Sequence, residues 1–152
     1  MKKLIKPLGS FNEVINVLLP HSELITTDLL TQGKAIKIDS KFLKIFLLEQ
    51  GHVNIRRIED ELIIATFFSP YVIGLSFYPS VGIYYSIELG ENCKIYQIPR
   101  SRALSTIRTH NLYNDWLRIF SYKISFLYAR DISIFCHNNR EIVYNLLSRL
   151  MN

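Results

Sequence analysis

The chain contains only two cysteines, Cys93 and Cys136, among its 152 residues. Two cysteines cannot supply the disulfide density of a small secreted scaffold, and an iron–sulfur sensor needs about four. No apolar run reaches the roughly 20 residues that a membrane-spanning helix requires, and Pro7, Asn12 and Glu13 interrupt the N-terminal segment before a signal-peptide core forms. These absences predict a cytoplasmic protein with reduced thiols and no membrane contact.

The residue clusters that most enzymes require are also missing. The histidines are isolated from one another in the sequence, so no clustered set of metal ligands is visible. The chain has no glycine-rich phosphate loop, no activated-serine motif and no pair of carboxylates with supporting polar neighbours. The sequence therefore predicts no enzyme, and no catalytic, cofactor-binding or metal-binding residue.

Acidic residues are scarce in residues 100–152, where eight Lys and Arg face three Asp and Glu. Residues 1–99 carry ten of each kind, so the net charge of +5 comes entirely from the C-terminal part. A basic surface of this kind is what a side facing a nucleic acid requires, because phosphate contacts supply most of the nonspecific affinity. A solvated helical surface explains the same charge equally well.

Hydrophobic residues are plentiful, at 49% of the chain, which is enough for one core. Between Glu23 and Ile98, short β-rich runs alternate with turn residues such as Gly51. The clearest runs are Ala35–Ile38, Phe42–Leu48, Val53–Ile58, Leu62–Phe68, Ile83–Leu89 and Cys93–Ile98. Short strands at this spacing predict a roll, a barrel or a sandwich.

Helices are predicted on both sides of the β-rich region. Ser10 and Glu13 have the spacing of a capping box, which predicts a short helix from about Phe11 to Leu19. After Pro99 the apolar period becomes helical. We expect a short helix at 101–109, a break near 110–111, a long helix at 112–135 and a final amphipathic helix within 140–152.

The long helix carries an apolar seam whose members follow alternating steps of four and three residues. Apart from the charged Asp131, the seam consists of Tyr113, Leu117, Phe120, Ile124, Leu127 and Ile134. A second stripe, which includes Trp116, Ile119 and Phe126, runs beside it. One stripe can pack on the β-rich region and the other on a twofold-related copy, as in a coiled coil. The pattern favours a homodimer, and a helix buried within its own domain is the alternative.

Three segments carry a resemblance to a known family. LLEQGHVNIRR (residues 47–57) resembles a strand–glycine–strand turn, and residues 68–75 resemble the approach to a ligand loop. CKIYQIPRSRAL (residues 93–104) resembles a last roll strand that runs into a helix. Together they resemble the transcription regulators of the catabolite activator and fumarate-nitrate regulator superfamily, above all the enterobacterial subgroup named for inhibition of hydrogen peroxide resistance.

The resemblance implies an α+β fold: a cyclic-nucleotide-binding-like β-roll (double-stranded β-helix) with a short N-terminal helix and a long C-terminal dimerisation helix. It also implies a β-roll domain with flanking helices at 1–111, the dimerisation helix at 112–137, and at 138–152 the first helix of a truncated winged helix-turn-helix. Because the base-reading helix of such a domain lies further on, Arg140 and Arg149 are expected to contact the DNA backbone at most.

The expected ligand loop lacks the residues with which family members hold a cyclic nucleotide. Those members place a Gly-Glu pair and, later, an Arg-Ser or Arg-Thr pair. Here Leu75 follows Gly74. Ile83 and Tyr84 lie near the position of the second pair. Because residues 58–93 contain no Arg or Lys, burying a phosphate there would be costly, and we expect no cyclic nucleotide to bind.

The loop is instead aromatic and neutral, with Phe77 and Tyr78 near its start. It either fills its own pocket or binds an apolar, uncharged ligand. The sequence therefore predicts the sensor and dimerisation region of a homodimeric transcription regulator, which binds DNA if a helix-turn-helix follows residue 152. One alternative is a truncated module that pairs with a full-length relative without binding DNA, and another is a roll that binds a small uncharged ligand.

Overall fold

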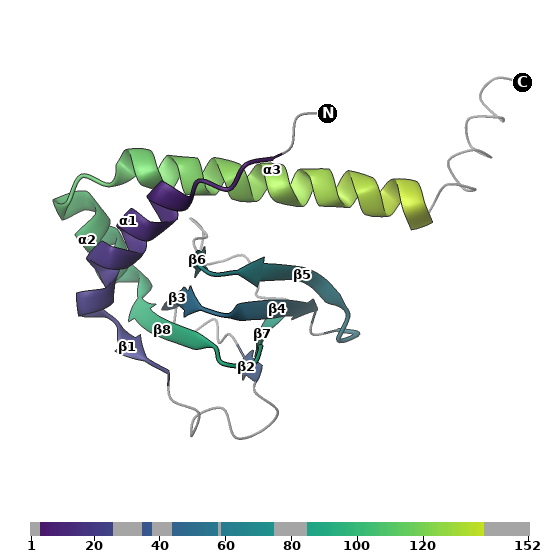
Figure 1. Cartoon of the computed structure of the whole chain (residues 1–152), viewed down its shortest axis with the longest axis horizontal. Helices are drawn as coiled ribbons and strands as arrows, with labels where there is room; N and C mark the ends of the chain where they lie inside the picture. The colour runs from purple at the N-terminus through teal and green to yellow at the C-terminus, as the bar shows by residue number, and fades with distance from the viewer. Residues whose placement is uncertain (1–3, 26–34, 38–43, 58, 75–84, 139–152) are drawn as a thin grey trace, which may run out of the picture.

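The structure, a computed structural model, describes residues 4–25, 35–37, 44–57, 59–74 and 85–138. Figure 1 shows the strands beneath the long helix α3 (Tyr113–Asn138), with α1 (Leu8–Leu18) and α2 (Arg100–Thr109) at one end. In chain order the elements are α1 (Leu8–Leu18), the 3-10 helix η1 (Leu19–His21), β1 (Glu23–Leu24), β2 (Ala35–Lys37), β3 (Lys44–Gln50), β4 (His52–Arg57), β5 (Ile63–Phe68), β6 (Tyr71–Ile73), β7 (Tyr85–Leu89), β8 (Lys94–Pro99), α2 (Arg100–Thr109) and α3 (Tyr113–Asn138).

Within the described residues the strands form two four-stranded antiparallel sheets, in the orders β1-β8-β3-β6 and β2-β7-β4-β5. Leu47 of β3 lies opposite Tyr96 of β8 on one side and opposite Val72 of β6 on the other. Consecutive strands such as β3 and β4 belong to different sheets, so the chain passes repeatedly from one layer to the other. This arrangement is a roll, and it confirms the predicted α+β fold class.

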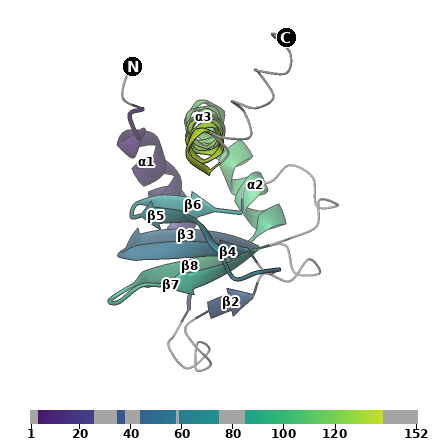
Figure 2. The ribbon, with the colours of Figure 1, turned by 90° about the vertical axis from the view of Figure 1, so that its right-hand side faces the viewer.

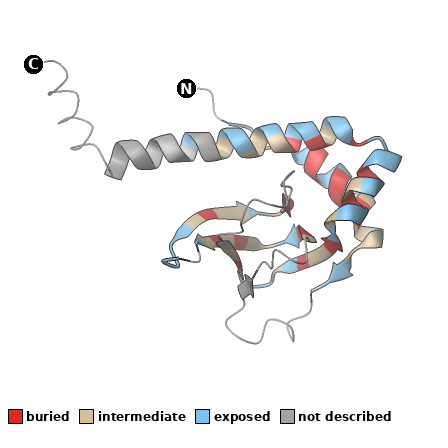
Figure 3. Ribbon diagram, turned by 180° about the vertical axis from the view of Figure 1, so that it is seen from behind, coloured by how far each residue is buried: buried red, intermediate tan, exposed pale blue. Residues whose placement is uncertain are grey.

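The core lies between the two sheets and under the helices. Residues Ile45–Leu48 of β3 are all buried, so this strand is covered on both faces, by the second sheet and by the helices. In β4 burial alternates instead: Val53 and Ile55 are buried, whereas Asn54 and Arg56 are half-buried. Figure 3 shows the buried segments gathering where the helices meet the strands.

The three helices lie on the same side of the sheets. Figure 2, which looks along α3, shows α1 on one side of it and α2 on the other. The Ser10 hydroxyl of α1 donates a hydrogen bond to Asp115 Oδ1 of α3 at 2.8 Å, which ties the two helices together. Asn111, with a φ of 55°, turns the chain between α2 and α3. The short helix after Pro99 and the break at 110–111 are thus confirmed.

The predicted capping box at the first helix is wrong. Helix α1 begins at Leu8, and its N-cap residue Pro7 has no side chain that can accept a hydrogen bond. Ser10 lies inside the helix and is buried against α3, so its hydroxyl bonds to Asp115 rather than capping its own helix. The capping-box spacing of Ser10 and Glu13 is therefore fortuitous. The packing of α1 against α3 supplies the hydrogen-bond partner of the serine instead.

Two other boundaries differ from the sequence prediction. Strand β6 was not foreseen, because its three residues directly follow Ser69-Pro70 and are too few to show an alternating pattern. Helix α3 continues to Asn138 rather than ending near Phe135. The remaining predicted strands lie within about two residues of those observed, the usual disagreement at element ends.

Candidate functional site

Helix α3 has two apolar faces, and only one of them is covered. Trp116 and Ile119 are buried against the rest of the domain, and Tyr122 and Phe126 on the same side are half-buried. This inward face joins the hydrophobic core, so it accounts for the second stripe in the sequence. It also fixes the rotation of α3 about its own axis.

The other face of α3 presents the predicted seam to solvent. Tyr113 is 49% exposed, Leu117 is 55% exposed and Ile124 is 54% exposed. Phe120, between them, is half-buried and has contacts within the chain. The side chains of the other two members, Leu127 and Ile134, lie outside the described residues. In the described part of α3, the structure therefore brings the seam together as one largely exposed stripe.

A cluster of aromatic rings lies beneath α3 and centres on Tyr71 of β6. Its ring stacks on Phe67 at 4.1 Å between centroids and on Phe11 of α1 at 5.0 Å. Two ammonium groups approach the same ring, Lys6 Nζ at 5.4 Å from its centroid and Lys123 Nζ at 5.2 Å. The cluster links α1, α3 and the end of the roll, and the sequence did not predict it.

Lys123 belongs to this cluster, and its pKa is strongly lowered. Its ammonium group projects from the inward face of α3 and donates a hydrogen bond to the Val72 carbonyl oxygen. Because burial disfavours the charged form, the pKa of Lys123 falls to about 7. Burial also raises the pKa of Tyr71 and lowers that of Lys6. A lysine whose pKa lies near neutral pH thus joins α3 to β6.

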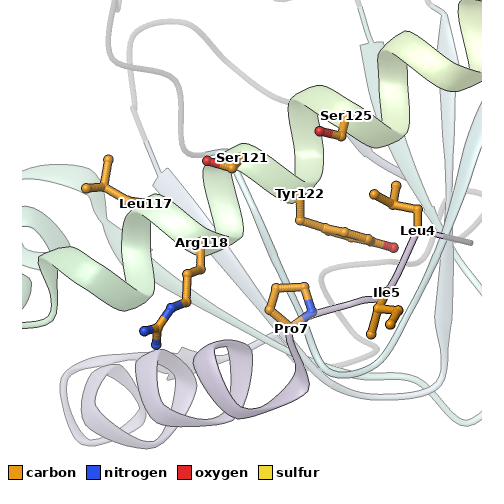
Figure 4. Close-up of a pocket in the computed structure, with 8 residues that line it drawn as sticks. All are labelled: Leu4, Ile5, Pro7, Leu117, Arg118, Ser121, Tyr122 and Ser125. Carbon is orange, nitrogen blue, oxygen red and sulfur yellow. The ribbon is translucent and has the colours of Figure 1, made fainter. Parts of the chain in front are cut away.

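A surface groove of about 440 Å³ runs between α3 and the N-terminal arm, by which we mean residues 4–7 (Figure 4). The arm supplies one wall and the exposed flank of α3 supplies the other. Residues of the groove include Leu4, Ile5, Pro7, Leu117, Ser121 and Tyr122. Leu117 belongs to both the seam and the groove, whereas the other α3 residues of the groove, Arg118, Ser121, Tyr122 and Ser125, lie outside the seam.

The predicted ligand loop is described only at its first residue, Gly74. Residues 75–84, which include Leu75, Phe77, Tyr78, Ile83 and Tyr84, lie outside the described part of the chain. Gly74 has a φ of 95°, and a Cβ atom there would come within 2.9 Å of the Lys44 carbonyl oxygen. The glycine is therefore required by the backbone geometry at the end of β6.

Substituting Gly74 with Ala is expected to lower the free energy of unfolding by about 1–3 kcal/mol, because the side chain imposes both backbone strain and a clash. Gly9 offers a matched control, because a Cβ atom there meets nothing within 4 Å and the residue lies in α1. Gly9→Ala should stabilise the protein by about 0.5 kcal/mol. Urea denaturation of both variants measures the difference, and an unaffected Gly74→Ala protein would contradict the packing described at this position.

The last two arginines before the loop, Arg56 and Arg57, are already paired with carboxylates. Arg56 Nε donates to Glu88 Oε2 at 2.5 Å, and Arg57 Nη2 donates to Asp60 Oδ2 at 2.5 Å. The hydrogen bond from Arg57 holds the pKa of Asp60 at about 2. These two guanidinium groups therefore serve the β4–β7 contact and the β4–β5 turn.

Neither a metal site nor a membrane span is found in the described part of the chain. Among those residues, no three His, Cys, Asp or Glu side chains come together in a way that would hold a metal ion. No described helix is long and apolar enough to cross a bilayer. The predicted DNA-backbone residues Arg140 and Arg149 lie outside the described residues.

Solved structures of transcription regulators have the same arrangement of roll and helices. Oxidised CprK bound to o-chlorophenolacetic acid superposes with a TM-score of 0.60 at 16% identity, over 91% of this chain and 60% of CprK. The catabolite activator protein of Thermus thermophilus gives a TM-score of 0.52 at 18% identity, over 90% of this chain and 59% of that protein. The chain has the β-roll fold of these regulators. The resemblance seen in the sequence is confirmed at the level of the fold.

A curated relative matches part of the sequence. The inhibitor of hydrogen peroxide resistance of Escherichia coli K12 is 26% identical over 97 residues, which cover 63% of this chain and 46% of that protein. The match thus spans about half the length of the relative. No family model matches the chain.

Proposed function

We propose that this chain is the sensor and dimerisation region of a DNA-binding transcription regulator. The observation that carries the proposal is the exposed apolar stripe of α3, on a fold that solved transcription regulators share. Three large apolar side chains at a spacing of four and seven residues stand in solvent on a helix whose opposite face is already packed. A stripe of this kind is the signature of a helix that pairs with another helix.

Two copies can pair through this stripe without any change to the domain. Tyr113, Leu117 and Ile124 lie on the outward face, and Trp116 and Ile119 on the inward face keep α3 attached to the roll. A twofold axis along α3 would bury the outward face against its own copy. We therefore propose a homodimer in which the roll of each copy lies on the outer side of a helix pair.

The proposed organisation follows the predicted parts of the chain. Residues 1–111 form the sensor roll with its flanking helices, residues 112–137 the dimerisation helix, and residues 138–152 begin a winged helix-turn-helix. Contacts to DNA would come from that last domain, with Arg140 and Arg149 as backbone contacts at most. The protein has a binding function rather than an enzymatic one in this proposal.

The sensor is proposed to respond to something other than a cyclic nucleotide. The lack of Arg and Lys in residues 58–93 supports this, because no cation of the loop can neutralise a phosphate. The pairing of Arg56 with Glu88 and of Arg57 with Asp60 also supports it, since neither guanidinium is available to an anion without breaking an ion pair. Ligand binding or repacking in the roll would change the affinity for DNA by shifting the position of α3.

The test is retention of fragmented genomic DNA by the purified native gene product, measured across salt concentrations with and without cyclic AMP. Retention should fall by roughly a thousandfold between about 50 and 200 mM salt, because real phosphate contacts release counterions. Cyclic AMP should leave it unchanged. Retention without a salt dependence would contradict DNA binding through phosphate contacts. Stronger DNA retention in the presence of cyclic AMP would contradict the prediction that the loop binds no cyclic nucleotide. A dimer that retains no DNA would instead favour the interaction module that pairs with a full-length relative.

A further inference from the structure

We propose that protons control the attachment of α3 to the roll: α3 stays against β6 while the Lys123 amine is neutral, and it moves away when the amine binds a proton. This inference rests on the proposed function, in which a shift of α3 changes DNA binding, and it names the proton as a regulating ligand. Three observations carry it: the place of Lys123 along α3, the partners of its amine, and the charges around it.

Lys123 lies where the attachment of α3 to the rest of the domain becomes weaker. Trp116 and Ile119, nearer the start of the helix, are buried and fix that end. The next inward side chains that the structure describes are those of Tyr122, Lys123 and Phe126, and each is only half-buried. Beyond Lys123 the helix continues for roughly 22 Å (Figure 1). A small tilt of α3 at Lys123 therefore becomes a larger displacement at the end of the helix.

The partners of the Lys123 amine suit its neutral form better than its charged form. Its Nζ donates a hydrogen bond to the Val72 carbonyl oxygen and lies 5.2 Å from the centroid of the Tyr71 ring. A neutral amine can make the same hydrogen bond and loses little hydration energy, whereas an ammonium group exchanges its water for a carbonyl and an aromatic ring. The neutral form therefore favours α3 against β6, and the charged form favours a position of α3 that lets the ammonium group reach water.

The titratable groups that the described part of the chain places around Lys123 do not compensate its charge. Tyr71 of β6 and Tyr122 of α3 are uncharged near neutral pH, because burial raises the pKa of both phenols. Lys6 of the arm, whose Nζ lies 5.4 Å from the centroid of the Tyr71 ring, has a charge of the same sign as Lys123. The rings that α1 and β5 add to this cluster belong to the uncharged residues Phe11 and Phe67.

No carboxylate among the described residues forms an ion pair with Lys123. The two acids of α3, Asp115 and Asp131, are each eight residues away in the sequence, or about 12 Å along the helix axis. Asp115 accepts a hydrogen bond from Ser10 at 2.8 Å and lies 3.6 Å from Arg118. Desolvation of the ammonium group therefore lowers the pKa of Lys123 to about 7 without an opposing carboxylate.

The size of the effect follows from where the proton is bound more tightly. With α3 against β6 the pKa of Lys123 is about 7, and with the amine in water it returns toward 10.5. Moving α3 away at pH 9 therefore takes up close to one proton, and at pH 7 about half of one. The equilibrium constant for this movement should rise by up to about fiftyfold when the pH falls from 9 to 7.

The experiment measures hydrogen exchange of the α3 amides at 121–126 in the full chain at pH 7 and pH 9, corrected for the intrinsic exchange rate at each pH. We expect the opening constant of this segment to be up to about fiftyfold larger at pH 7. Lys123→Met should remove most of the difference. Lys123→Arg, which stays charged at both pH values, should give the larger opening constant at both.

Lys6→Met is the matched control, because it removes the other ammonium group at the Tyr71 ring. It should keep most of the pH dependence. Strand β3, which lies in the core, reports global unfolding in the same experiment. If residues 121–126 exchange no faster than β3, α3 moves only when the whole domain unfolds, and the inference is overturned. The same pH dependence in Lys123→Met as in the unmodified chain would also overturn it.

DNA retention by the native gene product, measured at pH 7 and pH 9 with and without Lys123→Met, separates this inference from the function on which it rests. We expect retention to respond to pH, and Lys123→Met to reduce that response. Exchange at 121–126 that depends on Lys123, together with no DNA retention at any pH, would overturn the proposed function and leave proton control of α3 intact. An equal pH response of retention in both proteins would overturn the regulation of DNA binding by Lys123.

Discussion

Replacing Leu117 with Asp is expected to abolish the dimer at micromolar concentrations while leaving the domain folded. Leu117 is 55% exposed within the seam, so the carboxylate of an aspartate there can remain in solvent in the isolated chain. In the dimer, each copy would lose a buried leucine, worth about 1.5–3 kcal/mol, and place an unpaired carboxylate near its symmetry mate. The dissociation constant should rise by at least about a hundredfold.

Sedimentation velocity over a range of concentrations measures this effect, and circular dichroism reports whether α3 is retained. Leu117→Met should remain a dimer because it keeps the volume and the apolar character. Leu24→Asp introduces the same charge at an exposed leucine on β1 and should also remain a dimer. If Leu117→Asp sediments as the unmodified protein does, the seam is not the interface and the proposed function loses its main support.

The sequence located the seam but could not decide which of its two stripes faces solvent. Leu117 and Ile119 are both aliphatic residues of the same helix, and hydrophobic periodicity alone treats them alike. In the structure Ile119 is fully buried and Leu117 is exposed, because α1 and the roll dock on one side of α3 only. The rotation of a helix is a tertiary property, and the sequence pattern left it open.

The sequence predicted the fold best where a run of neighbouring residues shares the same kind of burial. Strand β3 was visible because the consecutive residues Ile45–Leu48 share the burial of a sheet core. The partner of Ser10 could not be predicted, because Asp115 is 105 residues away in the sequence and leaves no local pattern. The Tyr71 cluster was invisible for the same reason, since its rings and ammonium groups come from α1, the arm, the roll and α3. The neutral ligand loop stays a prediction.

Lys123 gives the second large expected effect, a pH dependence of stability that one substitution removes. The pKa of Lys123 is about 7 in the folded protein and 10.5 for an ordinary lysine. Between these values the unfolded chain binds more protons than the folded one, so the free energy of unfolding rises with pH. From pH 7 to about 9 the free energy of unfolding should rise by at most about 2 kcal/mol. The rise ends there because burial raises the pKa values of three other groups, so that the folded protein holds their protons at higher pH. These groups are Cys93, Tyr71 and Tyr122.

Lys123→Met should be more stable than the unmodified protein at pH 7 and should lose most of this slope, because the thioether fills the site without a charge to desolvate. Lys6, whose pKa is also lowered by burial, contributes the remainder. The difference at pH 7 is the net of the avoided desolvation and the lost hydrogen bond to the Val72 carbonyl oxygen. Lys94→Met, which removes an exposed lysine of β8, should keep the slope. Urea denaturation at equal protein concentrations between pH 7 and 9 decides the matter. A slope that persists in Lys123→Met would mean that another group carries the proton, and that Lys123 is not the titrating link between α3 and the roll.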